Sequence, residues 1–144
     1  MAATYDNKPR ESFNLNSLLR LALPSLWAGI ICWLSLTSNP PILIPGVLGW
    51  DKLQHAMAYA LLSILVAQYL HIYTHIWKTV FYACCLVILY GGLMEVLQLL
   101  MQTGRLAEWW DLVADIIGAL AGCVIFSQAS VVISKYHARN ETDG

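Results

Sequence analysis

Charged residues are scarce in this sequence for its length. Only 12% of its 144 residues are charged, against about 25% in an average soluble domain. A small soluble domain has a large surface relative to its volume, so this few charges would leave much of that surface apolar. Because 58% of the residues are hydrophobic, a soluble helical bundle is the weaker interpretation. The net charge of −1 provides no basic surface for a polyanion, so we expect no nucleic-acid partner.

The sequence also lacks paired cysteines and histidine-rich metal motifs. Its four cysteines all fall inside apolar runs, and none belongs to a C-x-x-C pair. We therefore interpret them as small apolar residues rather than as redox or metal ligands. No H-E-x-x-H motif is present, and His55 is alone on its predicted helix face. We expect neither a bound metal nor a cofactor.

Long apolar runs dominate the rest of the chain. A transmembrane helix needs roughly 20 mostly apolar residues, and four runs have about that length or more. Trp residues stand at several of their boundaries, which is typical of anchors at the membrane–water interface. The fold class that we predict is all-α: a polytopic membrane protein with four transmembrane helices in a compact bundle. The four runs lie at about residues 18–36, 53–72, 77–101 and 109–134.

Lys and Arg residues are divided unevenly between the two ends of these helices. With four spans, both termini and the middle connection lie on one side of the membrane, and six of the eight Lys and Arg residues fall there. Because positive charge is retained in the cytoplasm, we expect both termini to be cytoplasmic. A four-helix transmembrane domain at 17–136 then lies between a cytoplasmic N-terminal tail at 1–16 and a cytoplasmic C-terminal tail at 137–144.

The same topology brings polar residues from three helices to the outer leaflet. The second and fourth helices run inward, so their first residues lie at the outer side. The third helix runs outward, so its last residues lie there too. The polar residues expected at this end are Asp51, Lys52, His55 and Tyr59 from the second helix, Glu95 and Gln98 from the third, Arg105 and Glu108 from the connection, and Asp111 and Asp115 from the fourth.

Helical spacing places the carboxylates of the fourth helix on a packing face. Asp111 and Asp115 are followed, at intervals of three and four residues, by two glycines, so all four positions share one face. Gly118 and Gly122 form a G-x-x-x-G pattern, which lets helix backbones approach each other closely in lipid. We therefore expect the two carboxylates to face the bundle rather than the lipid.

The polar residues at the outer end can be interpreted as a functional site or as ordinary solvated residues at helix ends. A charge within the membrane costs about 2.5–3.5 kcal/mol on insertion scales and usually marks a functional interior site. We take His55, Glu95 and Asp111 as candidate acid–base catalytic residues. The alternative that Lys52 and Glu108 are ordinary solvated helix-end residues stays open. The candidate ligand-binding residues are Asp51, Lys52, Tyr59, Gln98, Arg105 and Asp115.

Three motifs at these positions resemble those of the VanZ-like family of bacterial membrane proteins. The resemblance extends over about residues 35–125, and the combination is more specific than any one motif. Asp115 is a departure, because the family usually has asparagine at this position. The motifs are Asp51-Lys52-x-x-His55-x-x-x-Tyr59, then Tyr90-Gly91-x-x-x-Glu95-x-x-Gln98, then Gly104-Arg105 followed by Asp111-x-x-x-Asp115-x-x-Gly118-x-x-x-Gly122.

The resemblance implies a multi-pass protein of the bacterial inner (cytoplasmic) membrane, in a family named after a member linked to resistance to the glycopeptide teicoplanin. Three functions stay open. A binding protein would hold a lipid-linked envelope precursor or a glycopeptide in the outer polar pocket, surrounded by membrane lipids. An enzyme would be an intramembrane hydrolase or transferase acting on a lipid or a lipid-linked glycan. A transporter is the weakest alternative, because the inner half lacks matching buried charges, and no particular oligomeric state is predicted.

Overall fold

The computed structural model describes residues 15–37, 51–101 and 108–142, and all regular structure in these ranges is helical. Each of the four helices is long and apolar enough to cross a membrane. The predicted all-α fold with four transmembrane helices is therefore confirmed, whereas the side on which the termini lie stays a prediction. The helices are α1 (Leu15–Leu36), α2 (Asp51–Leu70), α3 (Ile76–Met101) and α4 (Trp109–Thr142).

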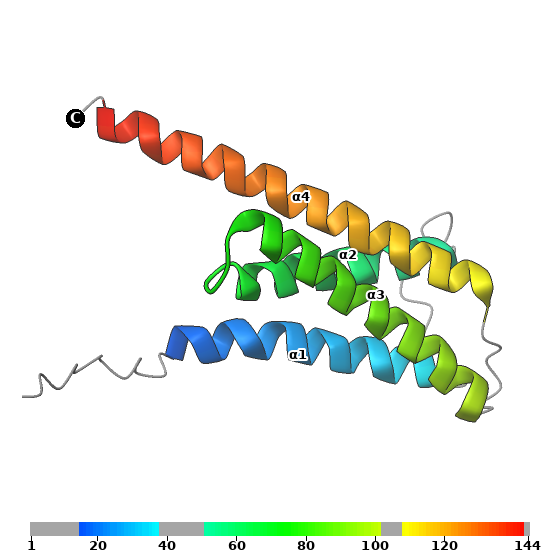
Figure 1. Ribbon diagram of the computed structural model, residues 1–144. Coiled ribbons are helices and arrows are strands. Elements are labelled where there is room, and N and C mark those ends of the chain that lie inside the picture. The colour runs from blue at the N-terminus through cyan, green and yellow to red at the C-terminus, as the bar shows by residue number, and fades with distance from the viewer. Residues whose placement is uncertain (1–14, 38–50, 102–107, 143–144) are drawn as a thin grey trace, which may run out of the picture.

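Two of the four helices form a central pair, and the other two flank it. Helices α2 and α3 lie in the middle, α4 packs mainly along α2, and α1 packs against α2 and α3 from the opposite side (Figure 1). The described parts of α1 and α4 do not contact each other. The outer helices are therefore attached to the same central pair through separate interfaces.

Helix α4 is longer than the sequence predicts. It has 34 residues, or about 51 Å at 1.5 Å per residue, whereas the hydrocarbon core of a bilayer is about 30 Å thick. Its C-terminal end runs past the ends of α2 and α3 (Figure 1). The predicted tail at 137–144 is thus helical as far as Thr142. Of the predicted N-terminal tail, residues 1–14 lie outside the described residues, and α1 begins at Leu15.

The backbones of α2 and α4 are in direct contact at two glycines. A methyl group built on Gly118 would overlap with the backbone carbonyl of Ala56, and one built on Gly122 would overlap with that of Ala60. Only hydrogen side chains permit so close an approach. The predicted G-x-x-x-G packing face of α4 is therefore confirmed, with α2 as its partner.

Small side chains fill much of the core near the C-terminal end of α2. Cys123 is buried against Ala67, Ala83 and Phe126. None of the four cysteines, all of which are described, forms a disulfide. This agrees with their interpretation as small apolar residues that pack between helices.

Helix α1 is attached by neutral hydrogen bonds. Each bond joins a side-chain N–H or O–H group to a backbone carbonyl of another helix, so these donors are satisfied without a charge in the membrane. The three bonds are Trp27 Nε1 to Ala58 O at 2.9 Å, Tyr90 Oη to Ala28 O at 2.6 Å, and Gln98 Nε2 to Ser35 O at 3.0 Å.

Candidate functional site

Lys52, at the start of α2, lies among three carboxylates. Its Nζ atom donates to Oε2 of Glu108 at 2.6 Å, just before α4, and to Oδ1 of Asp111 in the first turn of α4. Oδ2 of Asp51 lies 3.4 Å away. Acidic residues are favoured in the first turn of a helix because the exposed N–H groups there carry partial positive charge. The ion pairs thus join the N-terminal ends of two adjacent helices.

Burial in this cluster increases from its rim to its base. The side chains of Asp51 and Glu108 are 50% and 55% exposed, that of Lys52 is 19% exposed, and that of Asp111 is only 4% exposed. A half-exposed carboxylate remains solvated, whereas a buried one needs a partner nearby. Lys52 provides that partner for Asp111 and connects the buried base to the accessible rim.

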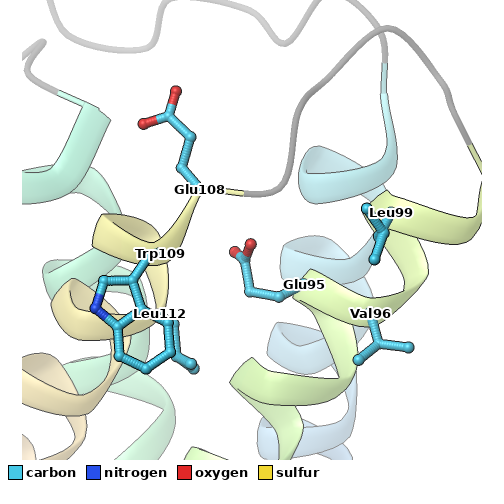
Figure 2. A pocket seen from close by; sticks show the side chains of 6 residues that line it. All are labelled: Glu95, Val96, Leu99, Glu108, Trp109 and Leu112. Atoms are coloured by element: carbon cyan, nitrogen blue, oxygen red, sulfur yellow. The ribbon is translucent and has the colours of Figure 1, made fainter.

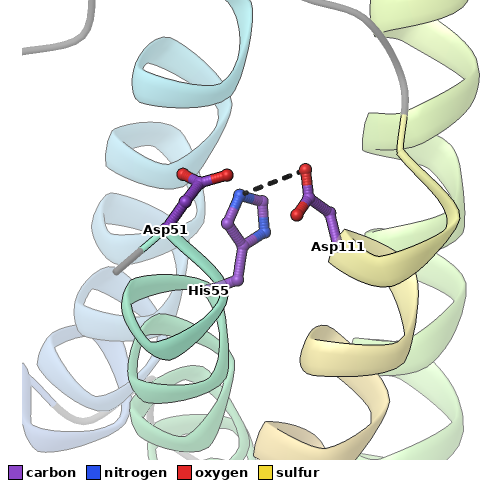
Figure 3. Close-up of side chains that lie close together, drawn as sticks. All are labelled: Asp51, His55 and Asp111. Carbon is purple, nitrogen blue, oxygen red and sulfur yellow. Dashed lines mark ion pairs between the residues drawn. The ribbon is translucent and has the colours of Figure 1, made fainter. Parts of the chain in front are cut away.

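His55 lies one helical turn below Asp51 and points toward α4. Its Nδ1 atom is 2.9 Å from Oδ1 of Asp115, and its Nε2 atom is 4.0 Å from Oδ2 of Asp111. Because a carboxylate accepts hydrogen bonds, Nδ1–H is the donor to Asp115, and a neutral imidazole then carries its lone pair on Nε2. Figure 3 shows Asp51 and Asp111 on either side of the imidazole.

Beneath His55, polar atoms remain without hydrogen bonds. Asp115 and Tyr59 are each only 1% exposed, and neither Oδ2 of Asp115 nor the Tyr59 hydroxyl has a hydrogen-bond partner. The Tyr59 ring stacks with His55 at a centroid distance of 6.5 Å. Gly91 of α3 leaves room for both side chains, since a methyl group there would lie 3.0 Å from Oδ2 of Asp115 and 3.1 Å from Cε1 of Tyr59.

Glu95 lies beside this cluster, in a cavity of about 210 Å³ between α3 and α4 (Figure 2). The Oε1 atom of its half-buried carboxylate has no hydrogen-bond partner. The cavity adjoins the cluster through Glu108, which lines it and also binds Lys52. The lining residues are Glu95, Val96, Leu99, Glu108, Trp109 and Leu112.

The predicted site residues thus fall into separate groups. The structure brings together Asp51, Lys52, His55, Tyr59, Asp111 and Asp115, as expected from topology and spacing. Gln98, a candidate ligand-binding residue, is 1% exposed and donates a hydrogen bond to the backbone of α1 instead. Arg105 lies outside the described residues. Glu108, left open as a solvated residue, binds Lys52 at the rim.

Charge and donor atoms in the cluster are unevenly balanced. Four carboxylates, those of Asp51, Glu108, Asp111 and Asp115, accompany the one ammonium group of Lys52. The described part of the site is therefore anionic when these groups are ionised, and it attracts cations. Asp51, His55 and Asp111 offer ligand atoms that all lie within 4.8 Å of one another.

Sequence comparison places these motifs in a family. The VanZ/LLP1 family matches residues 6–133, which is most of the chain. The chain belongs to the VanZ/LLP1 family. No curated protein and no solved structure gives a significant match. In this VanZ/LLP1 protein, the motif that begins at Asp51 supplies the α2 side of the cluster, and the motif that begins at Asp111 supplies the α4 side together with the glycines that hold the two helices together.

Proposed function

We propose that this VanZ/LLP1 protein binds a lipid-linked molecule of the bacterial envelope at the outer end of α2, α3 and α4. The proposal rests on one observation, that an apolar cavity directly adjoins a charged cluster. Glu108 belongs to both, since it lines the cavity beside Trp109 and holds Lys52 in the cluster. An amphiphile has the matching chemistry, with an apolar portion for the cavity and a polar head group for the cluster.

The cavity is suited to the apolar portion. Its walls include Val96, Leu99 and Leu112, and the ring of Trp109 lies on the α4 side (Figure 2). Apolar walls in a cleft between helices favour a hydrocarbon over water, because burying apolar surface is favourable. Glu95 is the exception, and its unsatisfied oxygen would meet the polar part of a ligand.

The side of the membrane follows from the distribution of Lys and Arg. Six of eight such residues lie at the opposite end of the helices, so the cluster faces the extracytoplasmic side in this proposal. Lipid-linked precursors are exposed on that side, and so are glycopeptides that bind them. We extend the proposal to glycopeptide susceptibility, as the family resemblance implies. Deletion of the protein should change susceptibility to teicoplanin, and unchanged susceptibility would remove that role for this member.

Filling the cavity tests the binding proposal directly. The purified chain in lipid nanodiscs is titrated with a polyprenyl-pyrophosphate-linked sugar, and binding is followed by native mass spectrometry. Val96 lines the cavity and is exposed, so Val96→Trp should fill the space and weaken binding at least about 10-fold, roughly 1.4 kcal/mol. Val132→Trp, on an exposed part of α4 away from the cavity, is the matched control and should bind normally. Equal binding by both variants, or no binding by the native chain, would reject the proposal.

A second candidate, an intramembrane hydrolase or transferase, is favoured by one observation. The hydrogen bond from His55 to Asp115 orients the imidazole, and its Nε2 atom faces Asp111 at 4.0 Å. This is how a general base is commonly positioned. In this version His55, Asp111 and Glu95 provide the acid–base groups.

The enzyme version has its own test. His55→Ala and Glu95→Gln should abolish turnover of a lipid-linked substrate while membrane insertion remains intact. If the native chain forms no product with candidate lipids, and both variants lose ligand binding, the binding function is retained and the enzyme is rejected.

A further inference from the structure

Three side chains from two helices form a compact donor set at the outer end of the molecule. We propose that Asp51, His55 and Asp111 bind one divalent cation of the Mn²⁺ or Zn²⁺ class. Their ligand atoms lie within 4.8 Å of one another. Figure 3 shows the imidazole between the two carboxylates, with its Nε2 atom directed toward Asp111.

The spacing between donors suits an ion better than a direct hydrogen bond. Nε2 of His55 and Oδ2 of Asp111 are 4.0 Å apart, which is too long for a hydrogen bond. A metal lies about 2.0–2.2 Å from each nitrogen or oxygen ligand, so two donors on one ion are separated by roughly 3–4.3 Å. Asp51, whose Oδ2 atom also lies 3.4 Å from Nζ of Lys52, is half exposed, and its carboxylate would move by only a fraction of an ångström to complete the set.

His55 provides an independent indication that a ligand belongs here. Its side chain is nine-tenths buried, and its Nε2 atom makes no hydrogen bond to any residue in the described ranges. The other ring nitrogen donates to Asp115, which is itself buried. A carboxylate on one imidazole nitrogen fixes the tautomer that presents the other nitrogen to a metal. Asp115 is thus a positioning residue, which acts through His55.

Lys52 leaves room for the ion and does not replace it. Lys52 binds Oδ1 of Asp111, whereas Oδ2 of the same carboxylate faces His55. In the part of the cluster that the structure describes, four carboxylates lie around one ammonium group, and a dication would lower this excess of negative charge. Carboxylate oxygens suit Mg²⁺, Ca²⁺ and Mn²⁺, while imidazole suits Zn²⁺ and its neighbours. The mixed set therefore favours Mn²⁺ or Zn²⁺ over the cations that prefer only oxygen.

Such an ion would offset the repulsion between the carboxylates and an anionic head group. This role of the ion rests on the proposed function. A pyrophosphate head group is repelled by the carboxylates of the cluster, but a bound dication with open coordination positions would bridge the two. An ion on Nε2 would also occupy the lone pair that metal-free general-base catalysis by His55 requires.

Manganese binding to the complete chain tests the site without any ligand. The protein in nanodiscs of zwitterionic lipid is titrated with Mn²⁺ alone and followed by electron paramagnetic resonance. We expect one Mn²⁺ per chain, with hyperfine coupling to a single imidazole nitrogen. Asp51→Asn and His55→Ala should each weaken binding at least about 10-fold, and Asp115→Ala, which removes the acceptor that orients His55, should weaken it about 10- to 100-fold. His75→Ala, at an exposed histidine beyond the other end of α2, is the matched control.

Several results would overturn the site. They are the absence of saturable Mn²⁺, bound Mn²⁺ without nitrogen coupling in the native chain, and a loss of binding in His75→Ala but not in His55→Ala. The nitrogen coupling is measured on the native protein, so the test stands even if a variant does not fold. A chain that binds Mn²⁺ but no lipid-linked sugar rejects the proposed function alone, and the reverse result rejects the metal site alone.

Discussion

Helices α1 and α4 flank the same central pair, yet they are attached in different ways. The α1 interfaces use neutral hydrogen bonds, such as that from Trp27 to the carbonyl of Ala58. The α4 interface with α2 instead combines backbone contact at Gly118 with a group of charges around Lys52 and Asp111. One mode of attachment requires only packing and neutral polar groups, whereas the other keeps ionisable groups inside a membrane protein, where they are costly.

The two interfaces also differ in how many buried polar atoms lack a hydrogen-bond partner. Beside α4, the hydroxyls of Tyr59 and Ser63 and the Oδ2 atom of Asp115 lack hydrogen-bond partners, and Glu95 adds another such oxygen in the cavity. At the α1 interface the corresponding atom is Oε1 of Gln98. A buried polar atom without a partner is unfavourable in a low-dielectric interior. Their concentration near α4 indicates that this interface serves more than the attachment of a helix.

The largest difference between the two interfaces should appear when a methyl group is added to a glycine. Gly118→Ala would push against the backbone of α2, so the free energy of unfolding should fall by about 3 kcal/mol or more. Gly92→Ala, where the added methyl group meets nothing within 4 Å, should be neutral or slightly stabilising. Thermal unfolding in detergent measures both variants. Equal stability of the two would show that α2 and α4 are not in backbone contact.

Removing the central cation should have the next largest effect. Lys52→Met leaves buried Asp111 without its ion-pair partner and should cost about 3 kcal/mol of folding free energy. The double variant Lys52→Met/Asp111→Asn should recover a large part of that loss, because the uncompensated charge is gone. Lys78→Met, at an exposed position near the start of α3, should change stability by less than about 0.5 kcal/mol. A loss in the double variant as large as in the single one would contradict the ion pair.

Asp115→Asn should show how the charge of Asp115 affects stability, because it removes the charge and keeps the size of the side chain. An amide oxygen can still accept the hydrogen bond from His55, while a buried carboxylate is replaced by a neutral group of the same size. We expect stability to rise by roughly 1 kcal/mol, since a buried charge is removed without loss of packing. Unfolding in urea at neutral pH measures the change. A marked loss of stability would mean that the charge of Asp115 is required for folding.

The smallest effect is expected at the α1 interface. Tyr90→Phe removes one hydrogen bond, to the carbonyl of Ala28, and keeps the ring. Interhelical hydrogen bonds in membrane proteins average about 0.6 kcal/mol, and we expect a loss of that size. Binding of Mn²⁺ and of the lipid-linked sugar should be unchanged. A loss of either one would show that the two interfaces are coupled.

Local geometry explains what could be predicted from the sequence. The spans follow from length and apolar content, and the face of α4 follows from the helical repeat that joins Asp111 and Asp115 to Gly118. The repeat alone predicts burial of both carboxylates, and they are 3% and 1% exposed. The family resemblance was likewise carried by residues close together in the chain.

Pairings between helices could not be predicted, because they depend on the rotation and axial offset of one helix against another. Glu95 and His55 are predicted at similar depth in the membrane and therefore in one group. In the structure, Glu95 lines the cavity beside Glu108. The same uncertainty applied to Gln98, which is directed to α1. The role of Gly91 in leaving room for two buried side chains had no signal beyond its place in the α3 motif.

The proposed metal site depends on the same pairing of helices. No H-E-x-x-H motif is present and His55 is alone on its predicted helix face, so the sequence predicts no metal, and this stays a prediction. The donor set in the structure takes Asp51 and His55 from α2 and Asp111 from α4. Donors separated by dozens of positions are visible as a set only once the packing of the two helices is known.

The decisive measurement is the labelling of both rim positions in intact cells. Asp51→Cys and Glu108→Cys, each in a chain whose four native cysteines are replaced by alanine, are treated with a membrane-impermeant maleimide. Both rim side chains are half exposed, so we predict that each reacts from outside the cell, whereas a cysteine at Lys78 reacts only after the membrane is opened. Labelling of positions 51 and 108 from opposite sides of the membrane would contradict a shared outer site.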